Sequence, residues 1–273
     1  MSKKMILGSV VVLVALVVGI FIAVASKENN KELDSLERIL DKKTLILGLD
    51  DSFPPMGFRN ENNEIVGFDI DVAKEVSKRL GVELVLQPIS WTAKEQELNS
   101  YNIDCIWNGM SIDNDRKEKM SLSMPYLENS MSFVVKTDNG INFLEDLKCK
   151  KIGVQSGSTA EEILQESELY KEIAEVVSYN DNITAFMDLE IGQIDSVFLD
   201  NVVANYYIAS NNKPYRVVEE SLAEEEYAIG FRKQDVELRD KVNETLNEMK
   251  NDGSLGQIST KWFGKDITLV KGK

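Results

Sequence analysis

Segments with the character of β-strands alternate with helical segments from residue 44 to near the end of the chain. We expect strands at residues 44–49, 83–87, 103–107, 152–155, 176–179, 194–199 and 227–231. We expect helices at residues 71–80, 160–164, 182–191 and 236–250, with another running from Thr92 towards Leu98. This alternation predicts an α/β fold, because successive strand–helix–strand units build a sheet covered by helices.

The two halves of the chain share a local pattern. Residues 98–104 (LNSYNID) and 189–195 (LEIGQID) each end a predicted helix and lead into a strand that begins with Ile-Asp. Together with the repeated order of strands and helices, this similarity favours two lobes built on one plan.

Two capping-box pairs predict where helices begin. Asp34 with Glu37 predicts the start of a short helix that ends near Leu40, and Thr92 with Glu95 predicts the start of another. In such a pair each side chain binds the backbone N–H of the other residue, which satisfies two N–H groups at the helix start.

The N-terminal segment has the features of an export leader. An uncharged, mostly apolar run at residues 5–25 follows two lysines and ends in the small-x-small pattern Ala-Val-Ala. These features fit a cleaved signal peptide, and the run is also long enough to span a bilayer as an uncleaved anchor. We therefore predict export, with residues 1–25 as a signal peptide or membrane anchor and residues 26–43 as a tether.

Composition excludes several classes of function. A formal charge of −15 argues against nucleic acid or anionic lipid as a partner, since phosphate binding needs a basic surface. The sequence contains no histidine, which excludes Ser-His-Asp and Cys-His catalysis and the commonest ligand of transition metals. Cys105 lies in an apolar strand and Cys149 in a polar loop, and their spacing suggests no bridge, so we expect free thiols. We predict no metal, no cofactor and no catalytic residue.

Polar and aromatic residues gather where the predicted strands end, which is where open α/β sheets bind ligands. The candidates are Asp50, Phe53, Trp91, Gly109, Ser111, Arg116, the turn at residues 156–159, and Asp200. A free amino acid needs such a set, because its carboxylate and its ammonium are both charged and neither can be buried unpaired. A guanidinium or a Gly-rich helix start suits the carboxylate, another carboxylate suits the ammonium, and aromatic faces suit the side chain.

Each candidate also has a purely structural interpretation. Arg116 lies in a charged run and fits a solvated helix face, whereas Asp200 fits the N-cap of a following helix. Residues 156–159 fit a simple helix-start turn and lack the pattern of a phosphate-binding loop. Trp91 and Phe53 fit the hydrophobic core. From the residues alone, these alternatives stay open.

Longer motifs indicate a family. They are LILGLDDSFPPMGF (45–58), GFDIDVAKEVSKRLG (67–81), IDCIWNGMSIDNDR (103–116), SLSMPY (121–126), LEDLKCKKIGVQSGSTAEE (144–162), IDSVFLDN (194–201) and KWFGK (261–265). In these motifs and their order, the chain resembles the extracellular solute-binding proteins of polar-amino-acid ABC transporters, bacterial family 3. The resemblance covers about residues 40–266.

The resemblance implies a two-lobed, type II periplasmic-binding-protein fold of the α/β class. Lobe 1 is expected to comprise residues 44–127 and 226–268, and lobe 2 residues 131–222. Two hinge strands, near residues 126–130 and 223–227, would join the lobes. Ligand would bind in the cleft between the lobes and close them by a hinge motion.

The resemblance also implies a role for each site residue. Arg116 would bind the ligand carboxylate, and Gly109, Ser111 and Thr159 would add hydrogen bonds around it. Asp200 would pair with the α-ammonium. The remaining residues would line the entrance or flank the ligand side chain: Asp50, Phe53 and Trp91.

The chain departs from the family pattern next to Arg116. The usual Thr-x-Thr-x-x-Arg stretch is replaced by residues 111–116, where Asp113 either weakens the grip on the carboxylate or orients the guanidinium. Gln155 and Lys94 lie where the ligand side chain would be recognised. Gln155 suits an amide, which favours glutamine as the ligand.

The function implied is that of an exported receptor, monomeric, that delivers a polar L-amino acid to an ABC transporter permease in the membrane. Two alternatives come from other classes: an enzyme on the same fold, such as a cyclohexadienyl dehydratase, and a ligand-sensing module. An enzyme would need a placed acid and a stabilised leaving group. Arg116 and Asp200 placed for a whole amino acid favour binding over turnover.

Overall fold

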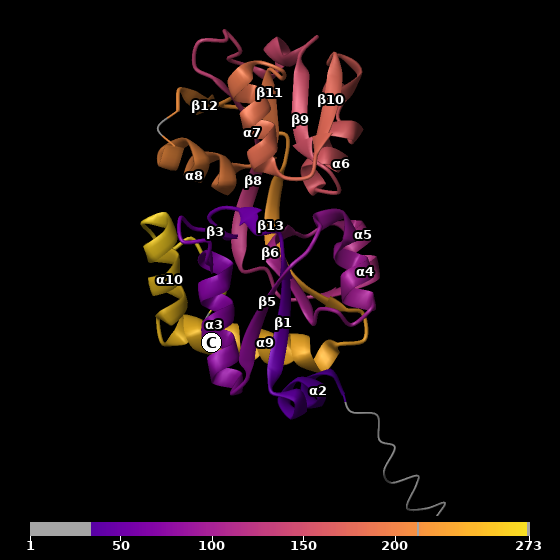
Figure 1. Cartoon of the computed structure of the whole chain (residues 1–273), viewed down its shortest axis with the longest axis vertical. Coiled ribbons are helices and arrows are strands. Elements are labelled where there is room, and N and C mark those ends of the chain that lie inside the picture. The colour runs from indigo at the N-terminus through magenta and orange to yellow at the C-terminus, as the bar shows by residue number, and fades with distance from the viewer. Residues whose placement is uncertain (1–33, 212, 272–273) are drawn as a thin grey trace, which may run out of the picture.

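The computed structural model describes residues 34–211 and 213–271, which form two α/β lobes stacked along the long axis of the molecule (Figure 1). The predicted leader and the first part of the predicted tether, residues 26–33, lie outside the described residues. We call the part that contains β1 lobe 1, which is the lower one in Figure 1, and the part that contains β9 lobe 2.

Lobe 1 is built on a parallel arrangement of three strands, with β1 in the middle. These strands are β1 (Thr44–Leu49), β5 (Glu83–Pro88) and β6 (Cys105–Ser111). The helices of this lobe are α2 (Ser35–Lys42), α3 (Phe68–Leu80), α4 (Lys94–Asn99), α5 (Asn114–Lys119), α9 (Val236–Asn251) and α10 (Ser254–Phe263). A small antiparallel sheet follows β1 and comprises β2 (Ser52–Phe53), β3 (Gly57–Arg59) and β4 (Ile65–Val66).

Lobe 2 repeats this plan. Its parallel strands are β9 (Lys151–Gln155), β10 (Glu175–Tyr179) and β11 (Ser196–Asp200), and β9 lies in the middle. The short strand β12 (Tyr215–Val217) belongs to the same sheet and pairs with β8 (Leu127–Lys136). The helices are α6 (Thr159–Glu166), α7 (Asn182–Ile191) and α8 (Asn201–Asn211). The parallel strands of each lobe therefore direct their carboxyl ends towards the space between the lobes.

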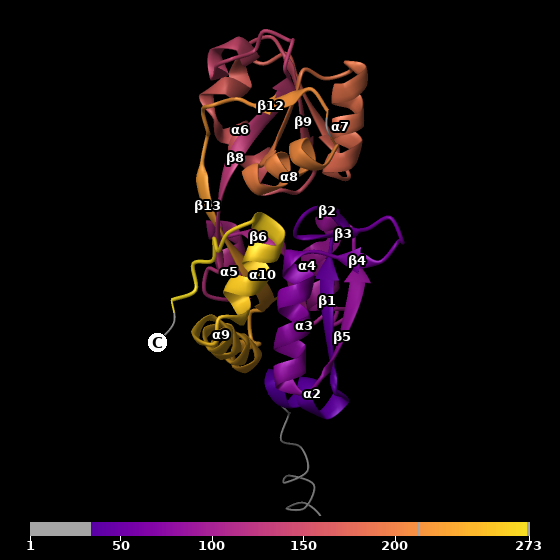
Figure 2. The same cartoon turned by 90° about the vertical axis from the view of Figure 1, so that its left-hand side faces the viewer.

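Two long antiparallel strands connect the lobes, β8 (Leu127–Lys136) and β13 (Glu224–Arg232), as the turned view in Figure 2 shows. They pair with each other from Leu127 opposite Tyr227 to Ser130 opposite Glu224. β8 then continues along β11 in lobe 2, while β13 pairs with β6 and with β7 (Met120–Leu122) in lobe 1. These are the two predicted hinge strands.

The sequence predicted most elements, and two starts need correction. The capping box of Asp34 and Glu37 is confirmed at the start of α2. The box predicted for Thr92 is wrong, because Thr92 lies inside a 3₁₀ turn (Trp91–Ala93) and its hydroxyl bonds to the Ser90 hydroxyl. Helix α3 begins at Phe68 and not at residue 71, because the Phe68 N–H donates to a carbonyl oxygen in the preceding loop, that of Pro55.

The end of the predicted tether is part of lobe 1. Ile39 in α2 is buried, and Arg38 forms an ion pair of 2.9 Å with the buried Asp235 at the start of α9. The Ser35 hydroxyl accepts a hydrogen bond from the backbone N–H of Leu238. Residues 35–42 are therefore folded onto the lobe, since both polar and apolar contacts hold them there.

The two cysteines lie in different environments. Cys105 is buried in β6, Cys149 is exposed before β9, and both thiols are free. Within residues 34–211 and 213–271, no helix has the length and apolar character needed to cross a membrane. The apolar run at residues 5–25 lies outside the described residues.

Candidate ligand-binding site

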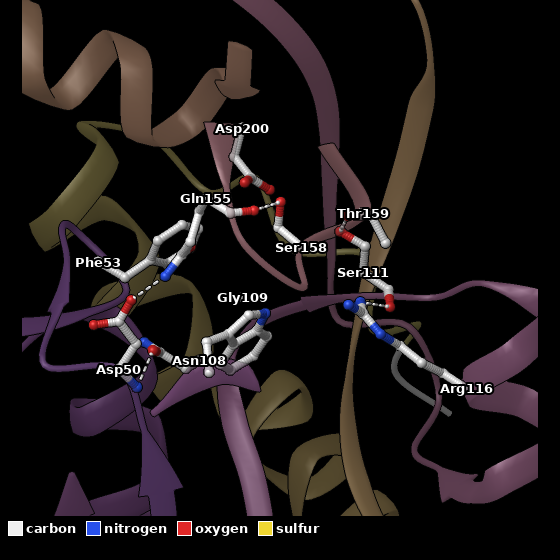
Figure 3. Close-up of a pocket in the computed structure, with 11 residues that line it drawn as sticks. Asp50, Phe53, Asn108, Gly109, Ser111, Arg116, Gln155, Ser158, Thr159 and Asp200 are labelled. Carbon is white, nitrogen blue, oxygen red and sulfur yellow. Dashed lines mark hydrogen bonds between the residues drawn. The ribbon is translucent and has the colours of Figure 1, made fainter. Parts of the chain in front are cut away.

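A cavity of about 300 Å³ lies between the two lobes at the carboxyl ends of their strands. Eleven side chains line it, and ten of them are labelled in Figure 3. The nine residues predicted from the sequence are all among them: Asp50, Phe53, Trp91, Gly109, Ser111, Arg116, Gln155, Thr159 and Asp200. Two further residues line it: Ser158, which was predicted only as part of the turn at residues 156–159, and Asn108, to which no role was assigned.

Arg116 is the buried cation of the cavity. It lies in α5, yet its side chain is only 4% exposed, so the interpretation as a solvated helix face is wrong. Its Nη1 donates to the Ser111 carbonyl at 2.7 Å, and its Nε pairs with the Asp113 carboxylate at 3.0 Å. Asp113 also caps α5 by accepting from the Arg116 N–H. Asp113 therefore orients the guanidinium by one edge and leaves Nη2 available for an anion.

The start of helix α6 faces the same cavity from lobe 2. Ser158 is its N-cap, because the Ser158 hydroxyl accepts from the Glu161 N–H. Gly157 has φ +69°, a conformation that favours glycine and allows the tight turn from β9 into α6. Thr159 is the first helical residue, and its hydroxyl lies 3.2 Å from the Ser111 hydroxyl of lobe 1. The partial positive charge of a helix start favours an anion here.

Asp200 is the buried carboxylate of lobe 2. It is the last residue of β11 and is 6% exposed. Its Oδ1 accepts from Asn129 Nδ2 at 2.8 Å and from the Tyr227 hydroxyl, both on the crossing strands. Burial, together with the nearby Glu225 carboxylate, raises the pKa of the Asp200 carboxyl to about 7. A cation placed beside Asp200 would favour the ionised form and relieve this cost.

Asp50 and Gln155 form a polar pair across the cleft. Gln155 Nε2 donates to Asp50 Oδ2 at 2.6 Å, and Gln155 Oε1 accepts from Asn182 Nδ2. Asn108 Oδ1 accepts from the Asp50 N–H at 2.8 Å and so fixes the end of β1. Burial raises the pKa of Asp50. In Figure 3, Asp50 and Arg116 lie on opposite sides of the cavity.

Aromatic rings complete the lining. Phe53 in β2 and Trp91 after β5 are both nearly buried and face the cavity. Gly109 has φ +58°, and a Cβ there would come within 2.9 Å of the Phe53 ring. The Gly109 N–H donates to the fully buried Asp69 carboxylate at 2.7 Å. Gly109 thus lets the Phe53 ring pack against the backbone of β6.

Lys94 supports the site without lining the cavity. Its Nζ lies 5.1 Å from the centre of the Trp91 ring and donates to the Gly157 carbonyl of lobe 2 at 3.0 Å. Burial, together with the positive charge of Arg116, lowers the pKa of Lys94 to about 8. Lys94 therefore bridges the lobes next to the cavity.

The described form of the protein is closed. Hydrogen bonds cross the cleft from Gln155 to Asp50, from Lys94 to Gly157, and between Thr159 and Ser111. At the cleft edge, the rings of Phe58 in β3 and Tyr206 in α8 lie 5.7 Å apart. The two lobes therefore present their side chains to one shared cavity.

Sequence reasoning missed the residues on the crossing strands. Asn129 and Tyr227 hold Asp200, and Glu225 accepts from the Ser111 hydroxyl at 2.8 Å. The pairing of β8 with β13 brings these distant residues together, and no local motif marks them. Within the part of the chain that the structure describes, no cluster of acidic residues and cysteines has the arrangement of a metal site.

Comparison with known proteins identifies the class of protein. Residues 45–265 match the model of the bacterial extracellular solute-binding proteins, family 3, and the chain belongs to this family. Its two lobes and central cavity are those of the type II amino-acid-binding proteins of this class.

Three curated relatives are particular members of this class. The chain is 33% identical to the L-cystine-binding protein TcyJ of Escherichia coli K12 over 85% of this chain and 87% of that protein. It is 34% identical to ABC transporter arginine-binding protein 1 of the same strain, over 79% and 89% of the two chains. It is 33% identical to the ABC transporter glutamine-binding protein GlnH of Bacillus subtilis 168, over 89% and 88%.

Two solved structures show the same fold. One is a substrate-binding protein of an ABC uptake transporter from Streptococcus pneumoniae with bound histidine, with TM-score 0.84 and 35% identity over 86% of this chain and 98% of that one. The other is the ancestral amino-acid-binding protein AncCDT-1, described as a precursor of cyclohexadienyl dehydratase, with TM-score 0.79 and 33% identity over 84% and 100%. The curated relatives named above are transport binding proteins and not enzymes.

Proposed function

We propose that this protein binds a polar L-amino acid outside the membrane and delivers it to an ABC importer by hinge closure. One observation carries the proposal: a buried guanidinium of lobe 1 and a buried carboxylate of lobe 2, Arg116 and Asp200, line the same cavity. An amino acid has one anionic and one cationic group on the same carbon, so it complements both.

The ligand carboxylate is assigned to the side of the cavity formed by Arg116, Ser111 and the start of α6. Arg116 Nη2 offers a charge-assisted donor, and the helix start adds a favourable dipole. The α-ammonium is assigned to Asp200, because burial raises the pKa of that carboxyl and a cation beside it would favour its ionised form. Phe53 and Trp91 then pack on the aliphatic part of the ligand side chain.

Glutamine is our first candidate for the ligand. The far side of the cavity holds Asp50, which accepts hydrogen bonds, and the amide of Gln155, which both donates and accepts. A side-chain carboxamide offers the complementary donors and acceptor. The glutamine-binding relative from Bacillus subtilis supports this choice, whereas the relatives that bind cystine and arginine make those the first competitors.

The proposal includes the organisation of the whole chain. Residues 44–127 and 226–268 act as one lobe and residues 131–222 as the other, and the protein works as a monomer with a membrane permease as its partner. Residues 1–25 direct export, as the extracellular family implies, and either leave as a signal peptide or stay as an anchor.

Thermal unfolding tests the proposal directly. The purified protein is unfolded and refolded to remove bound ligand, and its melting temperature is measured with each proteinogenic amino acid and with cystine. A ligand at a thousandfold excess over its Kd adds about 4 kcal/mol of stability. A clear rise with one or a few amino acids is the expected result, and the largest rise identifies the ligand. No rise with any of them would refute amino-acid binding, and a larger rise with arginine or lysine would refute the preference for glutamine.

An enzyme on this fold is the second candidate, because AncCDT-1 is both a structural neighbour and a dehydratase precursor. Turnover would require a proton donor next to a leaving group. Incubation with prephenate and with arogenate, followed by detection of the aromatic product, tests this candidate. We expect no product, because the carboxylate of Asp200 is assigned to hold the ammonium and not to protonate a leaving group.

A further inference from the structure

Glu225 is a carboxylate of the crossing strand β13 that lies directly behind the ligand cavity. Backbone pairing places it opposite Asn129 of β8. Its neighbours in the sequence, Glu224 and Glu226, are exposed, whereas Glu225 is half-buried. Because side chains alternate along a strand, Glu225 points to the face opposite to theirs, towards the ligand site.

The partners of Glu225 are the groups assigned to the ligand carboxylate. The Ser111 hydroxyl donates to Glu225 Oε2 at 2.8 Å, and the Thr159 hydroxyl donates to the Ser111 oxygen at 3.2 Å. The positive charge of Arg116 acts on the Glu225 carboxylate as well. Glu225 thus interacts directly with Ser111 of lobe 1 and, through Ser111, with Thr159 of lobe 2.

Glu225 is also linked to the group assigned to the ligand ammonium. Asn129 Nδ2 donates to Asp200 Oδ1 at 2.8 Å and lies 3.3 Å from Glu225 Oε2. The two carboxylate oxygens are therefore within about 6 Å of each other, a separation at which like charges interact strongly.

A hydroxyl group has a single proton to donate. While Ser111 donates to Glu225, its proton does not point to a ligand carboxylate in the cavity, and the proton of Thr159 points to the Ser111 oxygen. The negative charge of Glu225 also repels an arriving carboxylate. Only Arg116 and the start of α6 then remain as free partners for the ligand.

We infer that Glu225 is a positioning residue that competes with the ligand carboxylate for the hydroxyl proton of Ser111, so that the affinity for an amino acid depends on the charge of Glu225. The inference rests on the proposed function, because it concerns the carboxylate side of the same site. A protonated Glu225 would leave the Ser111 proton to the ligand and would itself become a donor.

The surroundings of Glu225 favour the neutral form more than water does. Burial raises the pKa of Glu225, although hydrogen bonds from Ser111 and Asn129 oppose the shift. The charged groups around it come from each neighbouring element: Arg116 and Lys117 on α5, Asp200 on β11, Glu128 on β8, and Glu224 and Glu226 on its own strand. Carboxylates outnumber cations in this set, so its balance of charge also favours protonation at mildly acidic pH.

The test compares a ligand that has the carboxylate with one that lacks it. The probes are the amino acid that stabilises the protein most in the thermal screen and its α-carboxamide, for example L-glutamine and L-glutamine α-amide. Both carry the α-ammonium below pH 7, because the α-amino group titrates near 7.7–8.0. The titration of Asp200 therefore affects both probes alike and cancels in the ratio of their Kd values.

The measurement is calorimetric titration of the full protein with both probes between pH 5.0 and pH 6.5. For the wild type, we expect the ratio Kd(amide)/Kd(acid) to rise as pH falls, because protonation of Glu225 strengthens only the binding of the carboxylate. For Glu225→Gln, we expect the acid to bind about tenfold tighter at pH 6.5, as for the removal of one nearby like charge. The variant should bind the amide within twofold of the wild type, and its ratio should not change with pH.

Glu226→Gln is the matched control, since it removes the same charge from the next residue of the same strand on the exposed face. It should behave like the wild type with both probes. Unfolding of each ligand-free variant verifies that the fold is kept. A wild-type ratio that is constant with pH, or an equal gain for acid and amide in Glu225→Gln, would overturn the inference. Failure of every amino acid to bind the wild type would instead refute the proposed function, and this inference with it.

Discussion

Arg116 in lobe 1 and Asp200 in lobe 2 are both buried, but different parts of the molecule hold them. The Arg116 guanidinium is fixed within lobe 1 by the Ser111 carbonyl and the Asp113 carboxylate. The Asp200 carboxylate is fixed by Asn129 and Tyr227, which lie on the crossing strands. A hinge motion would therefore leave the contacts of the Arg116 guanidinium unchanged. The contacts of the Asp200 carboxylate are with the crossing strands that form the hinge.

This difference explains how closure and binding are coupled. Neither lobe alone complements an amino acid, because the proposed partner of the carboxylate and that of the ammonium belong to opposite lobes. A ligand attached first to Arg116 gains its second ionic contact only when the lobes close. The differential affinity for the closed form is what shifts the equilibrium towards it.

Removal of the lobe 1 charge should have the largest effect. Arg116→Ala is expected to weaken amino-acid binding by about 2–5 kcal/mol, because it leaves the ligand carboxylate without its ionic partner. Calorimetric titration measures the loss. Lys117→Ala, an exposed neighbour on the same helix, is the control and should bind normally. An Arg116→Ala protein of wild-type affinity would place the carboxylate elsewhere.

Removal of the lobe 2 charge should weaken ligand binding and, at pH 8, stabilise the ligand-free protein. Asp200→Asn is expected to lower affinity by about 1.5–3 kcal/mol, the range for a hydrogen bond to a charged group. At pH 8 the same variant should raise the unfolding free energy of the ligand-free protein. At that pH the wild-type carboxylate is ionised although burial raises its pKa to about 7, so its charge destabilises the fold. Denaturant titration at pH 8 measures this change. A lower unfolding free energy for Asp200→Asn than for the wild type would contradict the prediction.

A second buried carboxylate, Asp69, sharpens the comparison, because it lies in lobe 1 away from the ligand. It accepts from the Gly109 N–H and from the Tyr126 hydroxyl, and burial raises its pKa to about 7. Between about pH 4 and pH 7, the folded protein therefore binds more protons than the unfolded chain. Stability should fall as pH rises through this window, by at most about 1.4 kcal/mol per pH unit for each such group, and level off above it.

Denaturant titrations from pH 4 to pH 8 measure this slope. Asp69→Asn should remove the part of the pH dependence of stability that comes from Asp69, both with and without ligand. Saturating ligand should remove the part of the pH dependence of stability that comes from Asp200, because the ligand ammonium lowers the pKa of that carboxyl. A slope that ligand leaves unchanged would mean that Asp200 gains no cation on binding.

The aromatic contact across the cleft edge should have the smallest effect. Tyr206→Ala removes the ring that packs on Phe58 and is expected to weaken closure by about 0.5–1.5 kcal/mol. Small-angle scattering of the ligand-free protein should then show a larger radius of gyration, and affinity should fall a few-fold. Tyr170→Ala removes an exposed ring of lobe 2 and serves as the control. Equal radii of the two variants would contradict a role of the Phe58–Tyr206 contact in closure.

The sequence predicted the architecture and most of the cavity-lining residues, but not which charged side chains are buried. Strand and helix periodicity predicted the α/β architecture, and the family motifs predicted nine residues that line one cavity. The charged run around Arg116 did not predict its burial, although two of its partners, the Ser111 carbonyl and the Asp113 carboxylate, lie within five residues of it in the sequence. The false capping box at Thr92 arose because the Ser90 hydroxyl competes for the Thr92 side chain.

Glu225 is the residue whose contacts were least predictable from the sequence. In the sequence it is the middle residue of three glutamates and reads as part of a solvated, acidic strand. Its contact with Ser111 joins residues 114 positions apart, and the link to Asp200 passes through Asn129 on another strand. Strand alternation alone permits either face, and only the pairing of β13 with β8 decides which one Glu225 occupies.

By itself, the sequence determined the order of strands and helices, the family and the residue types that the cavity contains, because these depend on local periodicity and on motifs. Only the tertiary structure decided which charges are buried, which groups hold them, and that Arg116 and Asp200 share one cavity. The physical reason is that burial and electrostatic coupling depend on distances between residues far apart in the chain. The crossing of β8 and β13 sets those distances here.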